Sequence, residues 1–276
     1  MEIKKPNLFI IGAPKSGTTF LYDKLKNHPQ LFFPKIKELN YFSYEFLNKY
    51  SYYKDFKIKS EKKYLSFFKK GSDKKYLVDA SVSYFTFDDV PKKIKKFNPE
   101  SKFIIIVRDP YKRAYSHYLM DKRMGYAYNS FTYYLNDPTS FHYRQYISNS
   151  QYEKQYRKYR NIFGSNNILI IQLENIQKDF KKIFSFLKIE SIDVDFSKRV
   201  NENKISKNFI GNITLRNRNF IEKIKLLIPE NILKYLKRII YTKAKTTSIS
   251  ENQLIKIKKM IKKNYEIFKE TINEKG

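Results

Sequence analysis

An apolar strand, a glycine-bounded loop and a helix follow one another within residues 7–29, and no other stretch restricts the possible folds of this chain so strongly. Residues 7–12 read NLFIIG, a short apolar run that predicts a buried parallel strand. After the loop APKSG, the stretch TTFLYDKLKNHP places Phe20, Leu21 and Leu25 on one helical face, and Pro29 stops the helix. Because backbone N–H groups at a helix N-terminus bind anions, this unit predicts a phosphate-binding loop.

Predicted strands and helices alternate along the next part of the chain. We expect strands at residues 75–82, 102–107 and 168–172, and helices at residues 90–97, 110–123, 151–163 and 175–187. Residues 124–150 show no clear period and predict a loop region with short helices. The alternation predicts an α/β fold of the P-loop kind, with a central parallel sheet flanked by helices.

The chain shows no repeat, low-complexity block or clear linker, so we expect one domain over residues 1–276. Residues 1–199 form its predicted α/β core. Residues 200–276 are basic and mostly helical in pattern, and we expect this helical C-terminal tail to cover a nucleotide and acceptor cleft.

The loop differs from an ATP-binding loop in the position of its lysine. The glycines match the pattern G-x-x-x-x-G-K-S/T, but the lysine is Lys15, inside the loop, and Thr18 follows the second glycine. In a nucleotide kinase, the lysine spans the terminal phosphates and the next hydroxyl binds magnesium. No acidic strand end completes a magnesium site here, so the loop predicts phosphate binding without a metal. A plain glycine turn between strand and helix is the alternative.

Composition narrows the possible partners only partly. The formal net charge is +29, which fits a polyanionic partner but also fits drift toward AT-rich codons, since Lys, Ile, Asn, Tyr and Phe are all plentiful. A hydrophobic content of 41% excludes a disordered chain.

Cysteine is absent, which excludes disulfides, thiolate zinc sites and cysteine nucleophiles. The apolar run from Leu8 to Ile11 is too short for the core of a signal peptide. No stretch approaches the roughly 18 apolar residues of a transmembrane helix. We therefore expect a soluble, cytoplasmic protein.

Five segments resemble the PAPS-dependent sulfotransferases, where PAPS is 3′-phosphoadenosine 5′-phosphosulfate. FIIGAPKSGTTFLYDKLKNHPQL resembles their 5′-phosphosulfate loop, and residues 104–117 (IIIVRDPYKRAYSH) resemble their 3′-phosphate motif. Residues 37–42 (KELNYF) resemble the K-E-x-x-F/Y-F segment of the carbohydrate branch, which includes the heparan sulfate enzymes. Residues 79–84 (DASVSY) resemble E-x-S/T-P-x-Y, with Asp for Glu and Val for Pro, and residues 151–187 resemble a later stretch. The resemblance covers roughly residues 7–190.

The resemblance implies that the loop holds the 5′-phosphosulfate. Lys15 would supply the cation, and Ser16, Gly17, Thr18 and Thr19 would supply backbone and hydroxyl donors. The alternative for Lys15 is a solvated surface lysine.

The 3′-phosphate would be held by Arg108 and Ser116. Arg108 follows a predicted parallel strand, where α/β proteins bind ligands, and its guanidinium suits a phosphate. The alternatives are a salt bridge from Arg108 to Asp109 or Asp79, and an ordinary helix serine at position 116.

The resemblance places a general base at Glu38, which would take the proton of the acceptor. The alternative is a surface ion pair with Lys35 or Lys37. Asp79 is the second candidate for the base, and His28, His117 and His142 are not candidates.

The resemblance implies an enzyme that transfers the sulfuryl group from PAPS to a hydroxyl or amine, leaving adenosine 3′,5′-bisphosphate, and the loop indicates that it does so without a metal. We expect the acceptor to be a carbohydrate or glycolipid, possibly acidic, with residues 40–70 and 124–150 lining its cleft by aromatic and lysine side chains.

Lys207 is a candidate to cover the nucleotide. No nucleic-acid-binding motif is present, and an amphipathic stretch at 220–241 leaves peripheral membrane contact open. The alternative functions are a P-loop nucleotide kinase and a non-catalytic polyanion-binding module.

Overall fold

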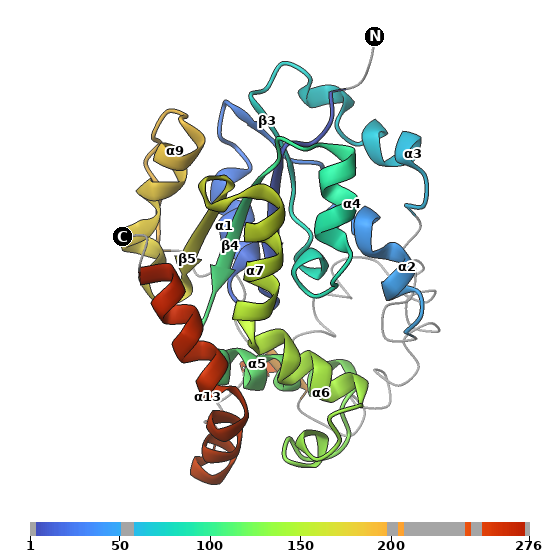
Figure 1. The fold of residues 1–276 in the computed structure, drawn as a ribbon, viewed down its shortest axis with the longest axis vertical. Coiled ribbons are helices and arrows are strands. Elements are labelled where there is room, and N and C mark those ends of the chain that lie inside the picture. Colours follow the sequence, from blue (N-terminus) through green and yellow to red (C-terminus); the bar gives the residue numbers. More distant parts are fainter. Residues whose placement is uncertain (1–3, 51–57, 198–203, 207–240, 244–249, 274–276) are drawn as a thin grey trace.

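A five-stranded, wholly parallel sheet forms the centre of the molecule, in the order β2-β3-β1-β4-β5 (Figure 1). The structure is a computed structural model that describes residues 4–50, 58–197, 204–206, 241–243 and 250–273. The strands of the sheet are β1 (Leu8–Gly12), β2 (Leu31–Phe32), β3 (Tyr76–Asp79), β4 (Lys102–Val107) and β5 (Ile168–Gln172). The predicted α/β fold with a central parallel sheet is confirmed.

Helices connect the strands and cover the sheet. In chain order they are α1 (Thr18–Leu25), α2 (Tyr44–Leu47), α3 (Glu61–Ser66), α4 (Val90–Phe97), α5 (Pro110–Met124), α6 (Phe141–Tyr146), α7 (Tyr152–Phe163), α8 (Ile176–Asp179), α9 (Lys181–Leu187) and α13 (Glu251–Asn273). Short 3₁₀ turns lie between several of them, and two of these, η1 (Tyr41–Ser43) and η3 (Val82–Phe85), contribute to the site.

The two faces of the sheet bury separate apolar clusters because successive strand residues point to opposite sides. Phe9 and Phe103 face α4 and α7, whereas Leu8 and Ile104 face α1 and α9, and all four are fully buried. Strand β1 is therefore packed on both of its faces, as are its neighbours β3 and β4. This packing holds the loop after β1 rigidly at the edge of the sheet.

Helix α5 begins and ends as its sequence predicts. The Asp109 side chain accepts hydrogen bonds from the backbone N–H groups of Tyr111 and Lys112, and Pro110 occupies the first turn. Gly125, with a φ of 74°, ends the helix in the left-handed region. Helix α5 thereby starts directly beneath the carboxyl end of β4.

Two predicted boundaries are corrected by the structure. The strand expected over residues 75–82 stops at Asp79, because Asp79 and Ser81 turn inward to bond one another and the chain enters η3. The helix expected over residues 175–187 is divided into α8 and α9 at Phe180.

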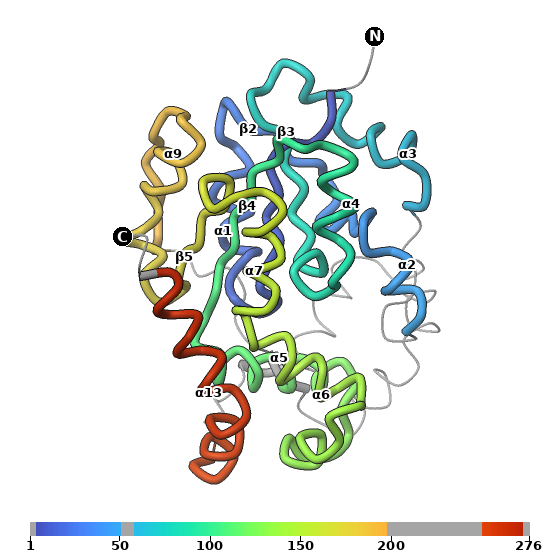
Figure 2. Tube along the Cα trace, viewed as in Figure 1, coloured from blue at the N-terminus to red at the C-terminus, as the bar shows by residue number. Residues whose placement is uncertain are grey.

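The C-terminal helix α13 packs on the core instead of standing apart. Figure 2 shows it running from the end of the molecule that holds α5 up along α7. Ile257 and Ile261 join a cluster with α5 and α6, and Phe268 packs edge-on against Tyr152 and Tyr156 of α7. A helical C-terminal segment was predicted and is present.

The remainder of the predicted tail is described only in part. A two-stranded antiparallel pairing joins β6 (Lys204–Ser206) to β7 (Tyr241–Lys243), which the sequence pattern did not predict. Lys207 and nearly all of the amphipathic stretch at 220–241 lie outside the described residues. The tail's covering of the cleft stays a prediction.

Truncation of Phe268 should destabilise the whole domain. This side chain is fully buried against α7, so Phe268→Ala should lower the free energy of unfolding by about 3–5 kcal/mol. Ile255 on the same helix is 58% exposed, and Ile255→Ala should change it by less than about 0.5 kcal/mol. Urea denaturation measures both, and equal effects would show that α13 is not docked in solution.

Candidate functional site

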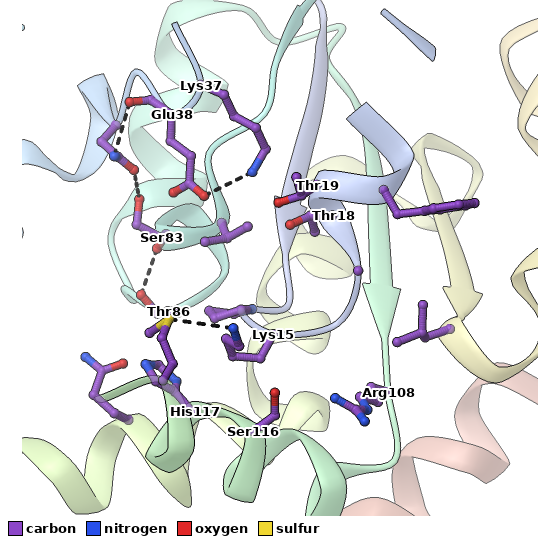
Figure 3. Close-up of a pocket in the computed structure, with 18 of the residues that line it drawn as sticks. Lys15, Thr18, Thr19, Lys37, Glu38, Ser83, Thr86, Arg108, Ser116 and His117 are labelled. Carbon is purple, nitrogen blue, oxygen red and sulfur yellow. Dashed lines mark hydrogen bonds and ion pairs between the residues drawn. The ribbon is translucent and has the colours of Figure 1, made fainter. Parts of the chain in front are cut away.

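A cleft of about 440 Å³ opens at the carboxyl ends of β1, β3, β4 and β5. In a parallel sheet these ends meet at one edge, which is where α/β proteins bind ligands. The cleft collects the loop after β1, the segment around Glu38, the η3 turn after β3, and one face of α5 (Figure 3). Four segments that are far apart in sequence thus share one space.

Seven of the eight predicted site residues line this cleft. They are Lys15, Gly17, Thr18, Thr19, Glu38, Arg108 and Ser116. Ser16 does not line it, because its side chain is fully buried beneath the loop, next to the hydroxyl of Tyr152. Ser16 can therefore contribute its backbone to the site, but its hydroxyl faces the core.

Two glycines give the loop its shape. Gly12 has a φ of 151°, and a Cβ built there would lie 2.7 Å from Cβ of Phe85. Gly17 precedes α1 with a φ of 90°, a left-handed conformation that glycine adopts without strain. The first N–H groups of α1 have no partner within the helix, and no acidic residue occupies its first turn. This end of α1 therefore suits an anion.

Lys15 is the cation of the loop and is largely removed from water. Its ammonium group approaches Sδ of Met120 at 3.6 Å, and its backbone has a φ of 68°. Burial, together with the positive charges of Arg123, Arg108 and Arg113, lowers the pKa of Lys15 to about 8, against the opposing effect of Asp121. A bound anion would relieve this repulsion, so the geometry favours a negatively charged ligand.

Arg108 and Ser116 lie together at the end of the cleft away from Glu38 (Figure 3). The backbone carbonyl of Arg108 accepts a hydrogen bond of 2.8 Å from the buried hydroxyl of Tyr152, which fixes the chain where β4 ends. The carboxylates proposed as alternative partners of Arg108 are engaged elsewhere: Asp109 caps α5 and Asp79 bonds three hydroxyl groups. Arg108 and Ser116 are thus arranged for a second anionic group.

Glu38 lies at the opposite end, with its side chain 24% exposed and its Oε1 3.3 Å from the ammonium of Lys37. The predicted alternative, an ion pair with Lys37, is therefore present, but within the cleft and not on an open surface. Burial raises the pKa of Glu38, and Lys37 and the backbone N–H of Val82 oppose the rise. A carboxylate in this setting can accept a proton from a molecule bound in the cleft.

Several lining residues were not singled out from the sequence. Asn40, Ser83, Thr86 and Gln145 add polar groups, and their neighbours Lys37, Leu47, Val82, Met120 and Leu173 complete the walls. Asn40 and Ser83 fall within segments 37–42 and 79–84, so those motifs could have pointed to them. His117 also lines the cleft; burial lowers its pKa well below the ordinary value, which keeps it neutral.

Of the aromatic side chains expected to line an acceptor cleft, those that the structure describes lie outside this cleft. From the described parts of residues 40–70 and 124–150, the cleft takes Asn40, Leu47 and Gln145. Many of the described tyrosines and phenylalanines of these regions pack on one another, as in the pairs Phe42–Tyr64 and Phe131–Tyr146. Because the chain has no tryptophan or cysteine, tyrosine and phenylalanine rings make up much of its hydrophobic core. Composition alone does not tell such core residues from residues that line a binding surface.

Within the described parts of the chain, no group of three or more His, Asp or Glu side chains could hold a metal ion. The same parts contain no helix that is both long and apolar enough to cross a bilayer.

A family model and a solved structure that resemble this chain both point to the same protein family. A family model described as "Sulfotransferase domain" matches residues 5–275. The crystal structure of a sulfotransferase from Alicyclobacillus acidocaldarius has a similar fold, with a TM-score of 0.63 and 24% identity over 72% of this chain and 87% of that one.

Curated relatives match over a shorter stretch. Human bifunctional heparan sulfate N-deacetylase/N-sulfotransferase 3 is 31% identical over 113 residues, which is 41% of this chain and 13% of that protein. Mouse heparan sulfate glucosamine 3-O-sulfotransferase 5 is 31% identical over 41% of this chain and 30% of its own length. The membrane-associated sulfotransferase kil1 of Dictyostelium discoideum gives the same identity over 22% of its length. The matched stretch thus spans less than a third of each relative.

The ammonium of Lys15 should titrate near pH 8, below the 10.5 of an ordinary lysine, because burial and the nearby arginines disfavour its charged form. NMR of the isotopically methylated protein measures this, with Lys15→Arg identifying the signal. Inorganic sulfate should raise the value, since an anion on the loop favours the ammonium. A titration at the ordinary value, insensitive to sulfate, would contradict the described geometry.

Proposed function

The chain belongs to the sulfotransferase family, and on that premise we propose that it transfers the sulfuryl group of PAPS to a hydroxyl or amine of a carbohydrate or glycolipid. The family uses PAPS as its donor. The observation that carries the proposal is a single cleft with a phosphate loop at its centre, an arginine–serine pair at one end and a carboxylate at the other.

The donor would bind across the loop. Lys15 and the first N–H groups of α1 would receive the 5′-phosphosulfate, and Arg108 with Ser116 would receive the 3′-phosphate. As the bond between sulfur and the 5′-phosphate oxygen breaks, negative charge grows on the leaving phosphate. Lys15 and the helix N-terminus stabilise that charge because they are fixed in place before the reaction.

The acceptor would enter beside Glu38. Its oxygen or nitrogen attacks sulfur, the Glu38 carboxylate takes the proton, and the products are the sulfated acceptor and adenosine 3′,5′-bisphosphate. Lys37 beside Glu38 favours the ionised carboxylate that this step requires. In an ATP-binding loop that works with magnesium, the lysine directly follows the second glycine, whereas here Lys15 lies inside the loop. We therefore propose that the transfer proceeds without a divalent metal.

A carbohydrate acceptor is supported by the relatives, whose names include heparan sulfate enzymes of both the N- and O-transferring kind. The net charge of +29 would attract an acidic glycan. Family membership favours sulfuryl transfer over the nucleotide kinase and over a non-catalytic polyanion-binding module.

The proposal is tested by incubating the protein with radiolabelled PAPS, with and without EDTA, and a panel of acceptors: heparosan, N-deacetylated heparosan, chondroitin and a galactolipid. Label on any acceptor in EDTA supports metal-free sulfuryl transfer. Label that requires added magnesium would overturn the metal-free step. Transfer from ATP but not from PAPS would favour the kinase.

Nucleotide binding should depend on the 3′-phosphate. Arg108→Ala should weaken binding of adenosine 3′,5′-bisphosphate by about 1.5–3 kcal/mol, the contribution of a hydrogen-bonded charged group. Binding of AMP, which lacks the 3′-phosphate, should change little in the same variant. Calorimetry measures both. Equal affinity of the parental protein for the two nucleotides would refute the assignment of Arg108 and Ser116.

Replacement of Glu38 should affect the chemical step far more than donor binding. Glu38→Gln keeps the shape and removes the proton acceptor, so kcat should fall by about 10²–10⁴ while the affinity for adenosine 3′,5′-bisphosphate holds. In the parental enzyme, activity should fall as the pH drops through the pKa of Glu38, which burial raises. Steady-state rates across pH give both results. A folded Glu38→Gln variant with parental kcat would place the base elsewhere.

A further inference from the structure

A buried carboxylate that does not reach the cleft lies at the end of β3. Asp79 is 1% exposed, and both of its oxygens accept hydrogen bonds. Oδ2 accepts from the hydroxyls of Tyr64 at 2.7 Å and Tyr84 at 2.8 Å, and Oδ1 accepts from Ser81 at 2.6 Å. A carboxylate costs free energy to bury unless it is satisfied in this way.

The hydroxyl of Ser81 connects this carboxylate to the segment that carries Glu38. While it donates to Asp79, Ser81 Oγ accepts a bond of 3.0 Å from the backbone N–H of Asn40. Asn40 has a φ of 54°, a left-handed conformation in which its side chain turns back along the chain. Its Nδ2 donates to the carbonyl of Glu38 at 3.3 Å, and its Oδ1 accepts from Ser83.

A second connection runs through the chain itself. Ser81 is followed directly by Val82, whose backbone N–H, a hydrogen-bond donor, lies close enough to the carboxylate of Glu38 to lower its pKa. The bond that ties Ser81 to Asp79 therefore also fixes the direction of this donor. Asp79 thus reaches Glu38 by two routes, one at its backbone and one at its carboxylate, and both pass through Ser81.

The side chains around Asp79 keep its carboxylate in a fixed, hydrogen-bonded position. Burial and the charge of Asp79 raise the pKa of both Tyr64 and Tyr84 well above the ordinary value, so both hydroxyls remain protonated donors. Burial, with a smaller effect from the negative charge of Glu38, raises the pKa of Asp79 itself to about 6, against these three hydroxyl bonds. With both oxygens bonded to buried hydroxyls and no atom lining the cleft, Asp79 is poorly placed to take a proton from a molecule bound there.

We propose that Asp79 and Ser81 form a positioning relay that sets the orientation of Glu38 through Asn40 and Val82, so that Asp79 acts on the transfer step without being its base. The proposal rests on the proposed function, in which Glu38 takes the proton. It assigns Asp79, the second candidate for the base, to a structural task behind the site.

Ser81→Ala cuts both routes, and Tyr64→Phe is its matched control. Tyr64→Phe removes a hydroxyl from the same buried carboxylate but leaves the contact with Asn40 intact. Each variant loses one buried hydroxyl, so each should lose similar stability. Only Ser81→Ala should change Glu38.

Carboxyl-labelled glutamate NMR measures this directly, with Glu38→Gln identifying the Glu38 signal. In Ser81→Ala the pKa of Glu38 should shift from its parental value, and in Tyr64→Phe it should remain near it. An unchanged Glu38 titration in Ser81→Ala would overturn the relay. This measurement needs no acceptor, so it decides the relay even if the proposed function fails.

The rate of transfer to a labelled panel acceptor tests the consequence. Ser81→Ala should lower kcat about tenfold with the KM for PAPS unchanged, because displacement of a reacting group slows chemistry without weakening donor binding. In a Glu38→Gln background the same change should have less than about a twofold effect. An equal loss in both backgrounds would show that Ser81 does not act through Glu38.

A parental kcat in Glu38→Gln alone would contradict the proposed base and not the positioning of Glu38, which the titration decides. If Ser81→Ala does not fold, Ser81→Cys replaces it, since a thiol at the same position is a far weaker donor and acceptor than the hydroxyl that bonds Asp79 and Asn40. A shifted Glu38 titration in that variant supports the relay, and a parental titration overturns it.

Discussion

The parallel pairing of β1 between β3 and β4 is the constraint on which the site depends. It brings the carboxyl ends of three strands to one edge of the sheet, and a different part of the site follows each of these strands. The loop around Lys15 follows β1, the Asp79 turn follows β3, and Arg108 follows β4. Apolar layers on both faces hold the strands in register, so the spacing of these groups is set by the core and not by the groups themselves.

Repulsion among positively charged side chains destabilises the cleft when no ligand is bound. Lys15 lies close enough to Arg108, Arg113 and Arg123 for their charges to lower its pKa. Arg113 is fully buried on α5, where it is held by the hydroxyl of Ser150 and backbone carbonyls of α6. Such a concentration of positive charge costs free energy until an anion binds. The binding of a polyanionic donor is therefore favoured by relief of repulsion as well as by direct contact.

Much of the site could be predicted because phosphate recognition is local. The spacing of Gly12, Lys15 and Gly17 fixes the loop, and Arg108 needs only to follow an apolar strand. Seven of eight predicted residues reach the cleft for this reason. The exception, Ser16, sits between Lys15 and Gly17, which both line the cleft, and only the packing of Tyr152 beneath the loop turns its hydroxyl inward. The role of the aromatic residues was harder to predict, because a tyrosine or phenylalanine can belong to the core or to a binding surface, and only its three-dimensional neighbours decide which.

The sequence by itself determined the alternating fold, the phosphate loop and the pairing of Arg108 with Ser116, since each is encoded by neighbours along the backbone. Only the tertiary structure decided the surroundings of Glu38. Its position relative to the loop, and the contacts that join Asp79 and Ser81 to Asn40, cross about forty residues of chain. No local spacing encodes such contacts, because they exist only once β3 and the segment after β2 are packed against the same core.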